Sequence, residues 1–289
     1  MDPQRDGHPP VEDKLWDDES TIAVGGPVPY WEIADGAAVL AHKPMIRETP
    51  WTLLVNGQHW LTLLCTPTDL RAFVLGFLFN EGIIERLADV SSLEIVEAPE
   101  TQIVVELARR DISLPQHRTL TTGCGGGITF FDLAAQREPI HSERRVTPEQ
   151  ISTLMQTLIA SVAREHRTVG GFHTSGLSHG EGFAVIASDI GRHNTLDKIA
   201  GACLLRGEPT HDAILLTTGR VSTEMLGKAA RMRIPVVATV NSPTYLAREL
   251  AHAWQITLIG YVRGARMHIY TGWKRVVGLP TVNRTQADA

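Results

Sequence analysis

The pattern of apolar and polar positions along the chain changes its rhythm near the middle. From Ala37 onward the two kinds of residue alternate, and the segments 52–55 and 60–64 flank an Asn56-Gly57 pair. Asn-Gly readily adopts the positive φ angles of a tight turn, so these segments predict a β-hairpin. The first half of the chain therefore begins with antiparallel strands.

A helix is predicted directly after this hairpin. Thr66-Pro67 offers an N-cap and a first-turn proline, and Glu81-Gly82 ends the pattern. Between them, apolar residues recur at helical spacing at Leu70, Phe73, Val74, Phe77 and Leu78. Segments 93–96 and 103–107 then predict a further strand pair, a loop holds residues 123–127, and a long helix is expected from Thr147 to about His166.

Past Gly170 the chain alternates between short apolar runs and helical stretches. The runs cover 183–187, 213–217, 236–240 and 257–261, and the helical stretches lie near 194–206, 222–232 and 243–254. This alternation predicts an α/β fold whose mostly parallel or mixed sheet has flanking helices, and ligands of such sheets bind beyond the carboxyl ends of the strands.

Two domains and two tails follow from these patterns. Residues 31–146 are expected to form a smaller β-rich N-terminal subdomain that ends in the 123–127 glycine loop, and residues 147–280 the α/β domain. Residues 1–30 are rich in Asp, Pro and Gly without an apolar period, so they predict a mobile tail. Residues 281–289 form a second tail.

Composition narrows the class of protein. The chain has 289 residues, 43% hydrophobic and 20% charged, and lacks the roughly 18 consecutive apolar residues that a membrane-spanning helix needs. Its first thirty residues are acidic instead of basic and then apolar as in a signal peptide, so we expect a cytoplasmic protein without a membrane partner. These thirty residues also account for the net charge of −5, and no broadly basic surface for nucleic acid is expected.

Three predicted junctions between a strand and a helix share a chemistry suited to phosphate. They are residues 188–194, where Asn194 is expected to cap a helix together with Asp197, residues 217–222 and residues 241–243. Parallel strands would bring all three to one edge of the sheet, where free backbone N–H groups, Arg192 and Arg220 can bind a diphosphate. The alternative is that they are helix caps and nothing more. Neither a Walker A motif nor G-x-G-x-x-G occurs.

The three cysteines, Cys65, Cys124 and Cys203, are too far apart in sequence to suggest a disulfide framework. Cys124 is preceded by Gly123 and followed by three glycines, so its thiol can be exposed and can move. Such a thiolate can accept and hand on a persulfide sulfur, although it can also be a small side chain tolerated in a loop. Cys65 and Cys203 fall on apolar faces and are expected to be core thiols.

Two histidines are candidates for proton transfer or metal binding. His173 follows Gly170-Gly171-Phe172, and His193 lies in the loop after the first strand of the α/β part. Either can instead make structural hydrogen bonds. Neither Cys-x-x-Cys nor His-Glu-x-x-His is present, so no metal site is expected.

Several motifs taken together resemble those of the FdhD family. The most specific is the block of residues 189–198, Asp-Ile-Gly-Arg-His-Asn followed by Asp-Lys. The others are Val55-Asn56-Gly57, Thr66-Pro67-Thr68-Asp69, Gly76-Phe77-Leu78 with Glu81-Gly82-Ile83-Ile84, Gly170-Gly171-Phe172-His173, Gly219-Arg220 with Ser222-Thr223-Glu224-Met225, and Ser242-Pro243-Thr244. The resemblance extends from about Ala37 to Arg275.

This resemblance implies a function. Family members are thought to take persulfide sulfur from a cysteine desulfurase and pass it to the molybdenum or tungsten bis-pyranopterin guanine dinucleotide cofactor, before the cofactor enters formate dehydrogenase. It also implies a cytidine-deaminase-like fold and a homodimer. By the same resemblance Cys124 is the sulfur carrier, and the cofactor contacts are Gly125, Gly126, His173, Asp189, Gly191, Arg192, His193, Asn194, Thr218, Gly219, Arg220, Ser222, Ser242, Pro243 and Thr244.

One departure from the family pattern bears on mechanism. The family loop carries Cys-Gly-x-Cys-Gly, whereas here Gly127 stands at the second cysteine position. A persulfide on Cys124 alone suffices chemically for transfer. A cofactor-binding chaperone in which Cys124 is dispensable stays open as the alternative. A deaminase-type hydrolase rests on fold analogy alone, since the His-x-Glu and Pro-Cys-x-x-Cys zinc ligands are missing.

Overall fold

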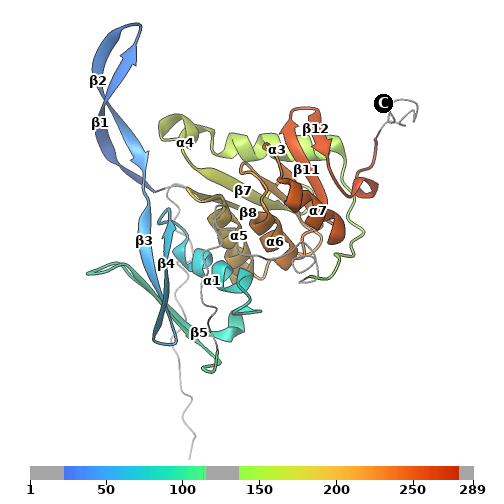
Figure 1. Ribbon diagram of the computed structural model, residues 1–289, viewed down its shortest axis with the longest axis horizontal. Helices are drawn as coiled ribbons and strands as arrows, with labels where there is room; N and C mark the ends of the chain where they lie inside the picture. The colour runs from blue at the N-terminus through green and yellow to red at the C-terminus, as the bar shows by residue number, and fades with distance from the viewer. Residues whose placement is uncertain (1–22, 113, 115–136, 280–289) are drawn as a thin grey trace, which may run out of the picture.

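The computed structural model describes residues 23–112, 114 and 137–279. Within these ranges the strands form a two-stranded, a four-stranded and a six-stranded sheet (Figure 1). No helix in them is long and apolar enough to cross a membrane. Three predicted site residues, Cys124, Gly125 and Gly126, lie outside the described residues, as do residues 1–22 and the predicted second tail. Every other predicted site residue can be placed.

The N-terminal strands form an arm that projects from the body of the molecule (Figure 1). The arm consists of β1 (Val24–Ala34) and β2 (Ala37–Ile46), which pair antiparallel around a turn with positive φ angles at Asp35 and Gly36. The sequence prediction of a tail through residue 30 is therefore wrong from Val24 onward. β1 pairs with β2 across a two-residue turn, and this pairing satisfies the backbone hydrogen bonds of the segment. Its content of Gly and Pro does not reveal the pairing.

The four-stranded sheet confirms both predicted strand pairs. It contains β3 (Thr49–Val55), β4 (Gln58–Cys65), β5 (Val90–Val96) and β6 (Gln102–Leu107), in the order β4-β3-β6-β5. One face is covered by α1 (Leu70–Asn80), and a short 3-10 turn, η1 (Leu87–Asp89), leads into β5.

The start of α1 differs from the prediction. Its N-cap is Asp69, with a φ of 53°, and the helix begins at Leu70 rather than at Thr66-Pro67. The Thr66 backbone N–H and hydroxyl group instead bond to the loop after β8, at Asp189 and Ile190. Thr66, which the local pattern assigned to helix capping, therefore makes a tertiary contact instead.

The six-stranded sheet has the order β12-β11-β10-β9-β7-β8. Its strands are β7 (His173–Ser178), β8 (Val185–Asp189), β9 (Ile214–Thr217), β10 (Val236–Thr239), β11 (Thr257–Arg263) and β12 (Arg266–Ile269). β8 to β11 run in one direction, whereas β7 and β12, which the sequence pattern did not predict, run opposite. A mixed α/β fold is confirmed, and the cytidine-deaminase-like classification stays a prediction.

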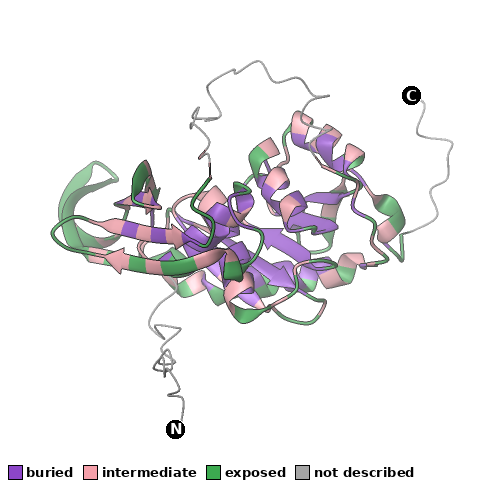
Figure 2. Cartoon of the chain, turned by 90° about the horizontal axis from the view of Figure 1, so that it is seen from below, coloured by how far each residue is buried: buried purple, intermediate pink, exposed green. Residues whose placement is uncertain are grey.

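Helices cover both faces of this sheet. The cluster with α5 (Arg192–Arg206), α6 (Thr223–Arg231) and α7 (Tyr245–Ala253) includes Leu215, while the cluster with α3 (Pro148–Ser161) includes its neighbour Leu216. Because both faces are buried, the strands appear in the sequence as continuous apolar runs. Figure 2 shows this buried interior beside the exposed arm.

The long helix expected from Thr147 is interrupted. Thr147, where the helix was expected to begin, is the N-cap of α3 and accepts the Gln150 N–H. α3 ends at Ser161, and α4 (Ala163–Thr168) follows after Val162. Near the C-terminus, η2 (Trp273–Arg275) precedes Val276, which bridges to Val146. Val146 therefore packs with the α/β part, although it precedes the boundary expected at residue 147.

Glycines join the two parts of the molecule where α1 crosses α5. A Cβ on Gly76 would lie 1.7 Å from the Asp197 carbonyl oxygen, and one on Gly201 would lie 1.8 Å from that of Ala72. The two backbones are therefore in direct contact. This crossing sets the β-rich part against the edge of the large sheet that bears β8 (Figure 1).

Candidate functional site

Three strands of the six-stranded sheet end at the same edge, where β7, which begins there, lies between β8 and β9. β8 ends at Asp189, β9 at Thr217 and β10 at Thr239, and the register pairs Asp189 with His173 and Thr217 with both Ser175 and Thr239. The three loops expected to bind an anion therefore follow these ends at one edge of the sheet. We call this the carboxyl edge.

Buried hydroxyl groups connect the strands at this edge. The Ser175 hydroxyl lies 2.7 Å from Thr195 Oγ1 and donates to Thr217 Oγ1 at 2.9 Å. The Thr174 and Ser188 hydroxyls lie 2.8 Å apart, and all five residues are buried. Ser188 and Thr217 belong to the predicted junctions, at the ends of apolar runs, whereas Thr174, Ser175 and Thr195 were not among the predicted site residues.

The loops after β9 and β10 are hydrogen-bonded to each other. The Asn241 amide donates to the Thr218 carbonyl oxygen at 2.7 Å. Val221 N–H donates to the Ser242 carbonyl oxygen, and Thr244 N–H to that of Val221. The predicted contacts Thr218, Gly219, Arg220, Ser222, Ser242, Pro243 and Thr244 thus lie on one continuous double loop.

Two helices begin in this double loop. Ser222 caps α6, as predicted, by accepting the Met225 N–H. The helix of the third junction, α7, begins later than predicted, because its N-cap is Thr244, which accepts the Ala247 N–H. Both helices therefore begin at the carboxyl edge, and the start of a helix favours negative charge.

The Asp189 carboxylate organises the loop after β8. It is fully buried, lies 2.8 Å from Lys198 Nζ, and accepts hydrogen bonds from Gly191 N–H and the Asn194 amide, each at 2.8 Å. The expectation that Asn194 caps α5 with Asp197 is wrong. The N-cap is Gly191, and Asp197 is buried against Lys228 at 2.6 Å.

Lys198 joins this loop to the β-rich part of the molecule. Its ammonium group donates to the Thr66 carbonyl oxygen, to Thr68 Oγ1 and to the Ser188 carbonyl oxygen, at 3.0 to 3.2 Å. The lysine is buried, so its charge is stabilised by Asp189 and by these acceptors. Its role as a link was not predicted, because Thr66 and Thr68 are more than a hundred residues away in sequence.

Both candidate histidines have lowered pKa values. His193 Nε2 lies 3.2 Å from Ser222 Oγ and 3.5 Å from Glu224 Oε2. Burial, followed by the charges of Arg192 and Lys228, lowers the pKa of His193 to about 3. Burial and Arg192 also lower the pKa of His173. The site therefore holds neutral imidazoles near pH 7, so His193 is hydrogen-bonded to Ser222 and lies beside Glu224 without carrying a charge.

Two arginines supply positive charge at the edge. Arg192 packs against Gly219, where an added Cβ would lie 2.9 Å from the Arg192 Cβ. Its buried Nε atom has no hydrogen-bond partner in the part of the chain that the structure describes. Arg220 is exposed. The site therefore has guanidinium donors available to an anion.

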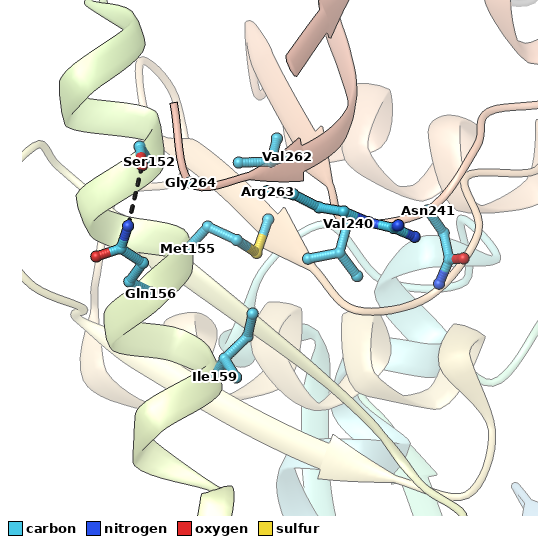
Figure 3. A pocket seen from close by; sticks show the side chains of 9 residues that line it. All are labelled: Ser152, Met155, Gln156, Ile159, Val240, Asn241, Val262, Arg263 and Gly264. Atoms are coloured by element: carbon cyan, nitrogen blue, oxygen red, sulfur yellow. Dashed lines mark hydrogen bonds between the residues drawn. The ribbon is translucent and has the colours of Figure 1, made fainter. Parts of the chain in front are cut away.

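A cavity of roughly 400 Å³ adjoins the double loop on the α3 side of the sheet (Figure 3). Met155, Ile159 and Val240 give it an apolar wall, and Arg263 extends toward Asn241. The remaining lining residues are Ser152, Gln156, Val262 and Gly264. Because Asn241 also bonds to Thr218, the cavity and the double loop share a wall.

The other two cysteines behave as the sequence predicted. Cys65 and Cys203 are buried, and burial raises the pKa of each thiol to about 12. Neither forms a reactive thiolate near neutral pH. The candidate carrier Cys124 lies outside the described residues, between Leu114 and Arg137.

Comparison with known proteins agrees with this architecture. The chain is 33% identical to the sulfur carrier protein FdhD of Staphylococcus aureus strain MRSA252 and 32% identical to that of strain Newman, in each case over 261 residues that cover 89% of this chain and 97% of the relative. A solved structure from Desulfotalea psychrophila, described as a formate dehydrogenase accessory protein, matches with a TM-score of 0.71 at 23% identity, over 88% of this chain and 100% of that one. The model of the FdhD/NarQ family matches residues 46–277. On this evidence the chain belongs to the FdhD/NarQ family.

Proposed function

We propose that this protein carries sulfur on Cys124 from a cysteine desulfurase to a molybdenum or tungsten cofactor of the bis-pyranopterin guanine dinucleotide type, for the maturation of formate dehydrogenase. The carboxyl edge supports the cofactor half of this proposal, because it combines two arginines and two helix starts with an adjoining cavity. The curated relatives support the sulfur half, since they are named sulfur carriers.

The cofactor is the cargo in this proposal, and the chain's own groups suit its parts. Arg192, Arg220 and the N–H groups at the starts of α6 and α7 would hold the diphosphate. The cavity, with an apolar wall beside Asn241 and Arg263, would receive a planar base. Asp189 and Asn194 are occupied by the hydrogen bonds that shape their loop, so they would position the site instead of contacting the cargo.

Sulfur would move by thiol–persulfide exchange. The Cys124 thiolate attacks the outer sulfur of the desulfurase persulfide, a new S–S bond forms on Cys124, and the old S–S bond breaks as the donor thiolate leaves. Attack on the outer sulfur of Cys124 by the acceptor then releases the Cys124 thiolate. One cysteine suffices for both steps, which is consistent with Gly127 at the second position of the family motif.

The first experiment tests the carrier residue. After incubation with a cysteine desulfurase and cysteine, intact mass spectrometry should show one added sulfur atom on the wild-type chain and none on Cys124→Ala. Cys65→Ala and Cys203→Ala serve as controls and should keep the label, because both thiols are buried with pKa values near 12. An unchanged label on Cys124→Ala would reject the proposal.

The second experiment tests the carboxyl edge, with GDP as the probe. Arg220→Ala should weaken GDP binding by about 10-fold or more in calorimetry, because a hydrogen bond to a charged group contributes about 1.5–3 kcal/mol. Arg233→Ala is the matched control, since this exposed arginine follows the opposite end of α6 and should leave the affinity unchanged. Equal affinity in both variants would place the nucleotide elsewhere.

The alternative is a cofactor-binding chaperone that does not transfer sulfur. The reason to test it is that Gly127 stands at the second cysteine position of the family motif. In cells that lack their own factor, Cys124→Ala should fail to restore formate dehydrogenase activity if the thiol carries sulfur. Full restoration by Cys124→Ala, together with GDP binding that depends on Arg220, would establish the chaperone instead.

A further inference from the structure

A second cavity, of roughly 470 Å³, lies at the other end of the six-stranded sheet. Its walls are the end of α1, residues 137–140, residues 210–211, which precede β9, and residues 230–233 at the end of α6. The cavity is therefore near the amino ends of β9 and β10, away from the carboxyl edge. Cavities of this size hold small organic molecules.

Part of the cavity wall is apolar and rigid. Met232 and Ile140 are 1% and 5% exposed, and both belong to the core cluster against which Phe79 packs. The Ile140 backbone is held on both sides, because its N–H donates to the Trp254 carbonyl oxygen and its own carbonyl oxygen accepts from Arg275. This wall suits the apolar body of a ligand.

Arg231 is fixed at the cavity by several contacts. Its Nε donates to the Phe79 carbonyl oxygen at 3.0 Å, and one Nη donates to Glu85 at 2.7 Å. The guanidinium group also lies over the Phe79 ring, 4.8 Å from its centroid. Glu85 balances the charge of Arg231, whereas its Nη1 group donates to no residue in the described ranges.

Arg137 is a positive charge without a counter-ion. It is half-buried and forms no ion pair within residues 23–112, 114 and 137–279. Burial, followed by the charge of Arg231, lowers the pKa of Arg137. Two guanidinium groups therefore repel each other beside one cavity, and an anion between them would replace this repulsion with attraction.

The charges around the cavity indicate how much negative charge it can accept. Arg137, Arg231 and Arg233 stand against Glu85 and Glu138, which leaves one positive charge. A monoanion matches this balance better than a phosphate group or a nucleotide, which carry more. The planar guanidinium group also matches the geometry of a carboxylate.

We propose that this cavity binds a small organic monocarboxylate, whose carboxylate lies between Arg137 and Arg231 and whose apolar body packs against Met232. The site is distinct from the carboxyl edge, and its occupation does not require sulfur transfer or nucleotide binding.

Benzoate tests the proposal, because it carries one carboxylate on a rigid apolar ring, and benzamide is its neutral analogue of similar shape. Ligand-observed NMR titrations would use the full-length chain at pH 8, above the ordinary pKa of histidine, because His211 also lines the cavity. Benzoate should bind, and benzamide should bind at least about 10-fold more weakly. Phenyl phosphate, which has the same ring and a dianionic group, should also bind more weakly than benzoate.

A matched pair of substitutions locates the binding. Arg137→Gln should weaken benzoate binding by about 10-fold or more, because it removes a charged hydrogen-bond donor. Arg164→Gln, at an exposed position of α4 that does not line the cavity, should keep the wild-type affinity. The urea midpoint of Arg137→Gln should not fall below that of the wild type, since the substitution breaks no ion pair within the described residues and removes a repulsion.

Four results would overturn the proposal. The wild-type chain could fail to bind benzoate, or bind benzamide or phenyl phosphate at least as tightly. Arg137→Gln could bind benzoate as tightly as the wild type, or Arg164→Gln could lose as much affinity as Arg137→Gln. A lower urea midpoint for Arg137→Gln would show that the charge of Arg137 is already balanced in the free protein.

Discussion

At the scale of single residues, the electrostatics of the carboxyl edge depend on charged groups that are buried. The Asp189 carboxylate and the Lys198 ammonium group are buried together, and their neighbours His173 and His193 are kept neutral by burial and nearby cations. Neutral imidazoles form hydrogen bonds without adding charge, so an anionic ligand would meet arginines as the positive groups and histidines as hydrogen-bonding groups.

The lowered pKa of His193 predicts a dependence of stability on pH. The pKa is 6.5 for an unperturbed histidine and about 3 in the folded protein, so between these values the unfolded chain takes up a proton that the folded chain does not. The free energy of unfolding then falls with falling pH, by at most about 1.4 kcal/mol per unit. Urea unfolding at pH 7 and pH 5 should show the wild type losing up to about 2 kcal/mol more than His193→Asn.

The comparison with His193→Asn isolates this contribution. Burial raises the pKa values of Glu81 and Glu224, which favours the folded state as pH falls, but both groups are present in both proteins. If the two proteins lose the same stability between pH 7 and pH 5, His193 titrates normally and the neutral imidazole assigned to the site is wrong.

At the scale of elements, the crossing of α1 and α5 determines how the two parts of the molecule meet. Gly76 and Gly201 let the helix backbones touch, with no room for a side chain at either position. Next to this contact, the Asn80 amide donates to Asp197 at 2.7 Å, and Asp197 pairs with Lys228 of α6. The contact therefore extends from α1 through α5 to the helix that Ser222 begins.

Gly76→Ala should destabilise the protein strongly, because the new methyl group would overlap the Asp197 carbonyl group and force the helices apart. Overpacking of this kind costs about 1–3 kcal/mol and sometimes more. Gly227→Ala on α6 is the control, since nothing lies within 4 Å of the added carbon, and it should stabilise by about 0.5–1 kcal/mol. Urea midpoints measure both changes, and a Gly76→Ala protein as stable as the wild type would show that the helices do not meet this closely.

At the scale of the whole molecule, the site is assembled by both parts of the chain. Thr66, which follows β4, donates its N–H to Asp189, and its hydroxyl accepts the Ile190 N–H. Lys198 binds Thr66 and Thr68 from the other side. The β-rich part thus holds the turn that leads into α5, whose first two residues are Arg192 and His193.

Much of the fold was predictable from the sequence for a local reason. Short-range turn chemistry and apolar periods predict the hairpin around Asn56-Gly57 and the strand pair β5–β6. They also predict the alternation of β8 to β11 with helices along the chain. The placement of three loops at one edge followed as well, because strands with helical crossovers run parallel. β7 and β12 were missed because His173–Ser178 mixes polar and small residues, and Arg266–Ile269 is only four residues long.

The amino-acid sequence by itself determined the family, the apolar runs that form the sheet and the candidate anion-binding loops, since these depend on residues close together in the chain. Only the tertiary structure decided that Thr66 leaves the start of α1 to bind Asp189, that Lys198 joins the two parts, and that a cavity adjoins Asn241. Each of these depends on groups far apart in sequence, whose burial makes an unsatisfied hydrogen bond or charge costly.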